Sequence, residues 1–231
     1  MVEQDIVIAF NYAFFKNTKQ ADRQNLAITV LKQLPNNFSP VAFSTKGEED
    51  YPDIMEDIPW INDLDKNSRD IVGNDRDLPY IKEILDRCCE LDNITVIGYI
   101  NSDILLGNDF INAMGEKHEA YIFSRFEIAE VNCNAFLEGK YKVIYGGDSH
   151  IGADGFFFDK TWWFNNRKYF PDNLIIGETE WDTCYRRIIA SKANDFVEKR
   201  VLFHVYHDAK WTKNSNGAKN NIKILESLDL S

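Results

Sequence analysis

The sequence predicts an α/β fold in which helices flank a central sheet. A strand, a helix and a second strand open the chain in that order, and further short apolar runs alternate with helical patterns after them. No internal repeat and no Pro/Gly/Ser-rich linker divides the 231 residues. A chain of this length can bury one large core, so we expect a single domain over residues 1–231.

The order of the elements follows from the spacing of apolar side chains. Residues 6–10 are an unbroken apolar run, typical of a buried strand, and apolar positions recur at helical spacing from 22 to 34, where Pro35 ends the helix. Residues 41–43 are predicted to form the second strand. Further strands are expected at 94–100, 120–128, 141–145, 155–158 and 201–206, and further helices at 82–91 and 181–190.

Two segments depart from this pattern. Residues 46–70 contain nine acidic and three basic residues and show no period, so we expect a surface excursion there. Residues 212–231 are expected to form a polar C-terminal tail that is weakly helical. Residues 199–223 carry six basic side chains against one Asp, which leaves a local cationic stretch in an acidic chain.

The composition excludes several classes of protein. Apolar residues make up 44% of the chain, too many for a disordered segment, and no stretch approaches the ~20 apolar residues of a membrane-spanning helix. The net charge of −11 argues against a surface that generally coats DNA or membranes. The N-terminus lacks the positive charge of a secretory signal, and the four cysteines form no C-x-x-C pair, so we expect reduced thiols in a cytoplasmic protein.

Polar residues that follow apolar runs are the first candidates for a site, because ligands of open α/β sheets lie beyond the carboxyl ends of the strands. Asp103 follows the apolar run 96–100. Its carboxylate is suited to a hard divalent cation, and it is equally suited to capping a following helix. The sequence leaves both roles open.

Two of the four histidines, His204 and His207, end the late strand. Residues three apart on an extended strand face opposite sides, so both can bind one ion only if the chain turns between them. One metal ligand with one residue that supports it is a second arrangement. A purely structural pair is a third.

The remaining candidates are acidic. Glu178, Glu180 and Asp182 place three carboxylates within five positions at a predicted helix start, where the helix dipole favours acidic residues. Crowded carboxylates bind protons more tightly, so one of them is also a candidate general base. Asp154 stands in the sequence GADG at 152–155, which suits either a close backbone approach to a ligand or a tight turn.

Five motifs follow one another along the chain. They are GNDRDLPYI at 73–81, YINSDI at 99–104, GADGFFF at 152–158, GETEWD at 177–182 and HVYHDAKW at 204–211. This ordered set resembles a nucleotide-sugar glycosyltransferase of the GT-A type and covers most of residues 5–211. The resemblance implies a single Rossmann-like domain with a central mixed, mostly parallel sheet. It also implies a nucleoside-diphosphate sugar as donor, with a UDP-sugar favoured.

The resemblance assigns roles around the expected metal site. Asn101-Ser102-Asp103 is similar to a D-x-D motif with Asn in its first position, which implies that Asp103 is the principal ligand of a divalent cation, Mn²⁺ or Mg²⁺. Asn101 and Ser102 are then expected to contact the donor. His204 resembles the late histidine that completes the metal site, and His207 competes for that role.

The resemblance also suggests how the donor is held. Phe10 and Asn11 lie at the end of the first strand, where such enzymes hold the base. Arg76 lies where a basic side chain meets the donor. Lys210 resembles a lysine that reaches the diphosphate.

Three carboxylates are the candidate catalytic residues. Asp182 and Glu180 resemble the acceptor-side acids that deprotonate a hydroxyl in inverting enzymes, and Asp154 is the third candidate. The acceptor is expected to carry a hydroxyl, and its class, nucleic acid included, stays open. One alternative is an inactive nucleotide- or glycan-binding module on the same fold, because Asn101 replaces an acid. The other is a nucleotidyltransferase, but the sequence after the first strand, NYAFF at 11–15, lacks the Gly-rich basic loop that such an enzyme needs.

Overall fold

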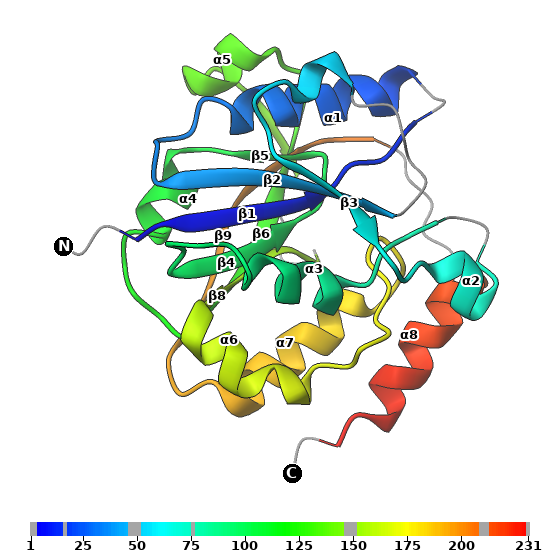
Figure 1. The fold of residues 1–231 in the computed structure, drawn as a ribbon. Helices are drawn as coiled ribbons and strands as arrows, with labels where there is room; N and C mark the ends of the chain where they lie inside the picture. Colours follow the sequence, from blue (N-terminus) through cyan, green and yellow to red (C-terminus); the bar gives the residue numbers. More distant parts are fainter. Residues whose placement is uncertain are drawn as a thin grey trace.

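The structure is a computed structural model that describes residues 4–15, 18–45, 52–74, 77–145, 152–207 and 213–229. Within these residues nine strands form one sheet in the order β3-β2-β1-β4-β8-β6-β9-β5, and β7 pairs with the end of β6 (Figure 1). The strands are β1 (Ile6–Asn11), β2 (Phe38–Thr45), β3 (Trp60–Leu64), β4 (Val96–Ile100), β5 (Ile104–Leu106), β6 (Ala120–Ile128), β7 (Val143–Tyr145), β8 (Ala153–Asp159) and β9 (Phe196–Val205).

The sheet is mixed, and most of its described strands run in one direction. β3, β2, β1 and β4 are parallel neighbours, with Ala9 of β1 beside Val41 of β2 and Tyr99 of β4. β8 is antiparallel to both β4 and β6, while β9 is parallel to β6 and antiparallel to β5. The mixed, mostly parallel sheet expected from the sequence is therefore confirmed.

Helices cover both faces of the sheet (Figure 1). Successive side chains of β1 alternate between two hydrophobic clusters: Val7 and Ala9 belong to one, and Ile6 and Ile8 belong to the other. The helices are α1 (Thr18–Leu31), α2 (Ser68–Val72), α3 (Ile81–Cys88), α4 (Asn108–Ala113), α5 (Cys133–Leu137), α6 (Lys160–Asn166), α7 (Trp181–Lys192) and α8 (Asn216–Ser227). The first cluster takes side chains from α3, α6 and α7, and the second takes side chains from α1 and α4.

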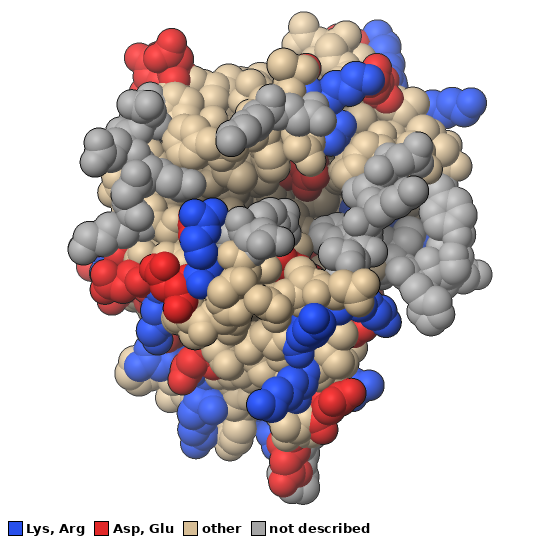
Figure 2. Space-filling view, turned by 90° about the vertical axis from the view of Figure 1, so that its right-hand side faces the viewer, with Lys and Arg blue, Asp and Glu red and all other residues tan. Residues whose placement is uncertain are grey.

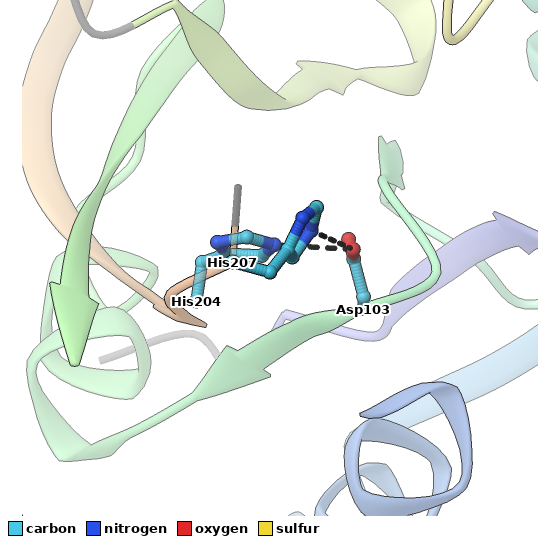
Figure 3. Close-up of side chains that lie close together, drawn as sticks. All are labelled: Asp103, His204 and His207. Carbon is cyan, nitrogen blue, oxygen red and sulfur yellow. Dashed lines mark hydrogen bonds and ion pairs between the residues drawn. The ribbon is translucent and has the colours of Figure 1, made fainter. Parts of the chain in front are cut away.

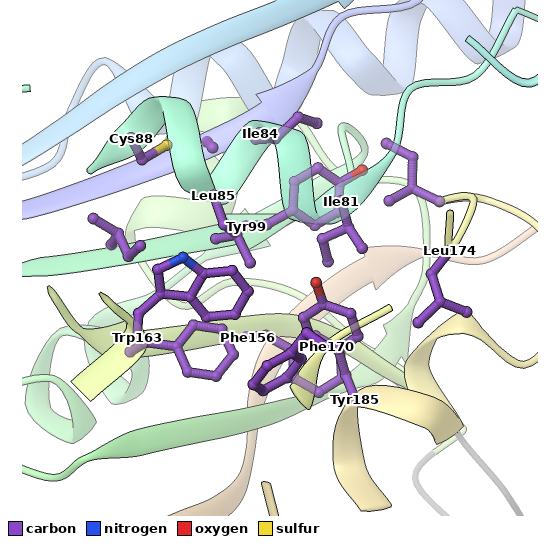
Figure 4. Close-up of a cluster of buried hydrophobic side chains, with 14 of the residues drawn as sticks. Ile81, Ile84, Leu85, Cys88, Tyr99, Phe156, Trp163, Phe170, Leu174 and Tyr185 are labelled. Carbon is purple, nitrogen blue, oxygen red and sulfur yellow. The ribbon is translucent and has the colours of Figure 1, made fainter. Parts of the chain in front are cut away.

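The cluster that includes side chains of α3 and α7 is rich in large aromatic residues (Figure 4). Phe156 and Phe158 of β8 contact Trp163, Phe170 and Tyr185, and all five side chains are buried. The aromatic run predicted as a short strand is thus the centre of this core. It fixes β8 between β4 and β6, and so fixes the residues at the start of β8.

The acidic segment 46–70 was expected to be a surface excursion, but part of it belongs to the sheet and the core. Its first part, 46–51, lies outside the described residues. The 3₁₀ turn η1 (Asp53–Met55) and strand β3 follow, and Met55, Ile58 and Leu64 are buried. β3 pairs with β2 on one side only, so most of its side chains stay partly exposed and its sequence shows no clear alternation.

Part of the expected polar tail is a packed helix. Ser215 caps α8 by accepting a hydrogen bond from the backbone nitrogen of Ala218, and Gly217, Ala218 and Asn221 are buried. Asn221 joins α8 to the body of the protein, because its side chain exchanges hydrogen bonds with both backbone groups of Ile175. None of the described helices has the length and apolarity needed to cross a membrane.

Candidate active site

The carboxyl ends of β1, β2, β3, β4, β6 and β9 meet at one edge of the sheet, because these strands share one direction. Figure 2 views this edge and shows a hollow near its centre, with acidic side chains visible inside it. Ligands of α/β sheets bind beyond such an edge. The predicted site residues can therefore be sought around this hollow.

Asp103 lies in the tight turn between β4 and β5. The backbone nitrogen of Ile104 donates to the carbonyl of Asn101, which closes the turn, and Ile104 pairs with His204 across the sheet. One carboxylate oxygen of Asp103, Oδ2, lies 3.1 Å from Nε2 of His204 and 3.9 Å from Nε2 of His207 (Figure 3). The structure thus brings together the three residues expected to bind a metal.

The two histidines meet because β9 ends between them. The strand stops at Val205, so the chain turns and His207 returns to the same side as His204. Their ring centroids are 4.9 Å apart. Of the arrangements left open by the sequence, the structure has the one in which both rings face a single carboxylate, and one ligand atom from each of the three residues lies within 4.8 Å of the others.

Protonation of His204 is strongly favoured in this cluster. Burial alone would raise the pKa of Asp103, but the hydrogen bond from His204 and the nearby imidazole of His207 hold it well below its usual range. Burial likewise disfavours the imidazolium of His204, yet hydrogen bonds to Asp103 and Glu127 raise its pKa to about 9. In the absence of a cation, a positively charged His204 therefore lies between two carboxylates.

Glu127 and Arg125 support the cluster from β6, and sequence reasoning missed both. Oε2 of Glu127 accepts a hydrogen bond from Nδ1 of His204 at 2.6 Å, and its Oε1 accepts one from Nε of Arg125 at 2.8 Å. The sequence nevertheless contained a feature that points to them. Arg125 and Glu127 are the only charged residues in the run 120–128, and residues two apart on a strand face the same side.

Asn101 contacts Asp154 rather than the histidines. Its Nδ2 donates to Oδ1 of Asp154 at 2.8 Å, and its backbone nitrogen donates to the carbonyl of Asp154 at 3.1 Å. Arg125 forms an ion pair with the same Oδ1. Asp154 is only 3% exposed, and burial raises its pKa to about 6 although Arg125 opposes this. Asp154 thus contacts both Asn101 and Arg125.

The three acidic residues at 178–182 have three different surroundings. Glu178 is buried, where it accepts hydrogen bonds from Asn74 and Ser215. Glu180 precedes α7 with a left-handed backbone (φ 71°), and its carboxylate lies 3.9 Å from Nζ of Lys213. Asp182 lies in the first turn of α7, so the carboxylates do not form one crowded group.

Asp182 is tied to the strand that carries Asp154. Its Oδ2 accepts a hydrogen bond from the backbone nitrogen of Ala153 at 3.1 Å. A Cβ atom at Gly152 would lie 2.4 Å from this oxygen, so glycine is what leaves room for the carboxylate. Burial raises the pKa of Asp182 above its ordinary value, which makes its anion a stronger base.

The residues expected to hold the donor differ in their exposure. The prediction that Phe10 contacts the base is not supported, because its ring is 0% exposed inside the core, whereas Asn11 and Ser102 are partly exposed near the strand ends. Side chains alternate along β1, so Phe10 and Asn11 face opposite sides of the strand. Arg76 and Lys210 lie outside the described residues.

An aromatic group beyond β1 was not predicted. Tyr12 and Phe14 form an edge-to-face pair with ring centroids 5.0 Å apart, and Phe14 contacts Trp60 at the start of β3. Phe14 is 45% exposed. The group lies just beyond the carboxyl end of β1. The three aromatic residues of stretch 11–15 are the sequence feature that could have predicted it.

Comparison with known proteins identifies the fold. No protein-family model matches the sequence, and no curated protein matches it. Among solved structures, S. aureus TarS 1–349 aligns with a TM-score of 0.51 at 10% identity, over 87% of this chain and 60% of the TarS 1–349 chain. Its complex with UDP-GlcNAc gives 0.52 at 8% identity over 90% and 60%.

GalNAc-T7 with UDP, GalNAc and Mn²⁺ aligns with a TM-score of 0.50 at 10% identity, over 96% of this chain and 48% of GalNAc-T7. This chain therefore spans 60% or less of each matched chain. At such low identity the likeness concerns the fold. Together with the mixed sheet and its strand order, it shows that the chain has the GT-A type fold of nucleotide-sugar glycosyltransferases.

Proposed function

We propose that the protein is a metal-dependent glycosyltransferase that moves a sugar from a nucleoside-diphosphate sugar to an acceptor hydroxyl. The observation that carries the proposal is the cluster of Asp103, His204 and His207 at the carboxyl edge of a GT-A type sheet. Complexes of the fold neighbours contain UDP-GlcNAc in TarS and UDP in GalNAc-T7, which favours a UDP-sugar as the donor here.

The donor atoms of the cluster fit a divalent cation. One carboxylate oxygen and two imidazole nitrogens suit Mn²⁺ better than Mg²⁺, which prefers oxygen ligands. The cluster also carries more negative than permanent positive charge. Among the described residues it contains the carboxylates of Asp103, Glu127 and Asp154, and Arg125 is its permanently charged cation. When bound, such an ion supplies positive charge against the diphosphate leaving group.

The chain's own polar groups would hold the donor around this ion. Asn101 directs its amide nitrogen at Asp154, which leaves its carbonyl oxygen for a ligand. Ser102 and Asn11 flank it with partly exposed side chains. Arg76 and Lys210 are proposed to meet the donor and its diphosphate, where their positive charge offsets the charge that develops on bond cleavage.

Asp182 is the proposed general base, with Glu180 as the second candidate. Asp182 is held in place by Ala153 and has a raised pKa, whereas Glu180 lies close to Lys213. An ionised Asp182 would accept the proton of the acceptor hydroxyl as the new glycosidic bond forms. In a retaining enzyme these carboxylates would instead orient the sugar. Asp154 is proposed to position Asn101 rather than to touch the substrate.

A panel of UDP- and GDP-sugars with Mn²⁺ tests the proposal, read as sugar transfer or as donor hydrolysis. Asp103→Asn and Asp182→Asn should each lower the rate by at least tenfold. Asp109→Asn, an exposed acid on α4, is the control and should keep the rate. Full activity in either site variant would show that the residue is wrongly assigned.

The alternative is a nucleotide- or glycan-binding module without catalysis, and the neutral Asn101 in the metal motif favours it. Thermal stabilisation by UDP with Mn²⁺, together with no turnover of any donor in the panel, would support this alternative. Turnover of one donor would exclude it.

A further inference from the structure

Arg125 is a partly buried cation that the proposed chemistry does not use directly. It lies on β6, and its side chain is 19% exposed. The register of β6 shifts beside it, between Phe123 and Ser124 against β8 and between Ser124 and Arg125 against β9. Such bulges re-aim side chains, so the local backbone directs Arg125 toward the ends of the neighbouring strands.

The guanidinium of Arg125 has two arms with different partners. Nε donates to Oε1 of Glu127, whose other oxygen accepts from His204, and His204 contacts Asp103. The second arm, NH1, pairs with Oδ1 of Asp154, which also accepts from the amide of Asn101. One residue is therefore linked to Asp103 through the first arm and to Asn101 through the second.

These links explain how the Asn101-Ser102-Asp103 turn can present two different groups. The first arm fixes the ring of His204 through Nδ1 and keeps Nε2 directed at Asp103. The second arm fixes which end of the Asn101 amide faces outward, because the nitrogen is bound to Asp154. A lysine could not hold both arms, since it lacks the rigid fork of arginine.

We propose that Arg125 is a positioning residue that fixes the metal-binding and donor-binding halves of the site together. It acts through Glu127 on His204 and through Asp154 on Asn101, and it touches neither the cation nor the donor. The functional consequence rests on the proposed function, because it assumes that Asp103 and Asn101 serve a metal and a nucleotide.

Arg125→Lys tests the proposal because it keeps the charge and removes the fork. Calorimetric titration with Mn²⁺, and with UDP at saturating Mn²⁺, should show affinities roughly tenfold to 100-fold weaker than wild type. Arg186→Lys is the matched control: Arg186 is a more exposed arginine that pairs with Glu198, and both affinities should stay within about twofold. Unchanged affinities in Arg125→Lys would overturn the proposal.

The two arms can be separated by their acidic partners. Glu127→Gln should weaken Mn²⁺ binding, whereas Asp154→Asn should weaken UDP binding at saturating Mn²⁺ and leave Mn²⁺ binding within about threefold. Equal effects of both variants on both ligands would contradict the assignment of one arm to each half of the site.

Unfolding of the metal-free protein separates a failure of this inference from a failure of the proposed function. In double-mutant cycles, the shift in melting temperature caused by Arg125→Lys should be smaller in the Glu127→Gln background and in the Asp154→Asn background than in wild type. Arg186→Lys should be additive with both. Additivity of Arg125→Lys in either background would overturn the two-armed link, even if the protein bound no metal or nucleotide.

Discussion

Gly152→Ala is a minimal change that should displace the proposed base. A Cβ at position 152 would lie 2.4 Å from Oδ2 of Asp182, whereas ordinary contact begins at about 3.4 Å, so the oxygen must move by about 1 Å. The movement weakens the 3.1 Å hydrogen bond from the nitrogen of Ala153, which costs about 1 kcal/mol of stability. A base misplaced by that distance lowers the rate of a positioned reaction by about 100-fold.

The assay is steady-state sugar transfer with the donor that the wild type accepts. We expect Gly152→Ala to lower kcat by about 100-fold and to leave KM for the donor nearly unchanged, because Asp182 acts on the acceptor side. Gly115→Ala adds the same methyl group at the opposite end of the sheet, 3.2 Å from the carbonyl of Asn112, and should keep kcat. A Gly152→Ala enzyme with wild-type kcat and a normal melting temperature would refute the role of Asp182.

Three further predictions concern stability, and urea unfolding measures each of them. Glu180 has a left-handed backbone (φ 71°), so Glu180→Gly should be more stable than Glu180→Ala by about 1 kcal/mol, and equal stabilities would contradict strain at this position. Burial raises the pKa of Asp154 from 3.8 to about 6, so the stability that its neutral form contributes is present below pH 4 and lost as the pH rises through about 6. Relative to Asp154→Asn, the free energy of unfolding of the wild type should fall by up to about 3 kcal/mol between pH 4 and 7. A difference that stays constant with pH would argue against the raised pKa. A Cβ at Gly98 would lie 2.0 Å from the ring of Phe157, so Gly98→Ala should destabilise the protein by about 1–3 kcal/mol, and wild-type stability would mean that the ring moves freely.

Long apolar runs made the main strands predictable. The prediction of 120–128 matches β6, and the runs at 6–10 and 94–100 locate β1 and β4 within two residues at their ends. β5 and α4 were missed because each is at most six residues long, too short to display a period. The first part of β2 was also hard to predict, because Pro40 lies inside the strand. Pairing between β2 and β3 begins only at Ala42, so the missing N–H of Pro40 removes no hydrogen bond to β3.

The candidate site was predictable only where residues of a metal-binding type directly follow a predicted strand. Asp103, His204 and His207 stood out because polar residues followed apolar runs, and the structure brings them together. Arg125 and Glu127 were missed because they belong to a strand whose neighbours in space, β8 and β9, come later in the sequence. The separation of Glu178 from Asp182 was equally hidden, since it depends on contacts of Glu178 with Asn74 and Ser215, far apart along the chain.

Binding of Mn²⁺ in the presence of UDP tests whether Asp103, His204 and His207 form a cation-dependent donor site. Electron paramagnetic resonance counts free and bound Mn²⁺. We predict that the wild type binds one Mn²⁺ per chain, that UDP tightens this binding, and that Asp103→Asn weakens it by at least tenfold. A wild-type protein that binds no Mn²⁺ with UDP, or an Asp103→Asn variant that binds it equally well, would contradict a cation site at these three residues.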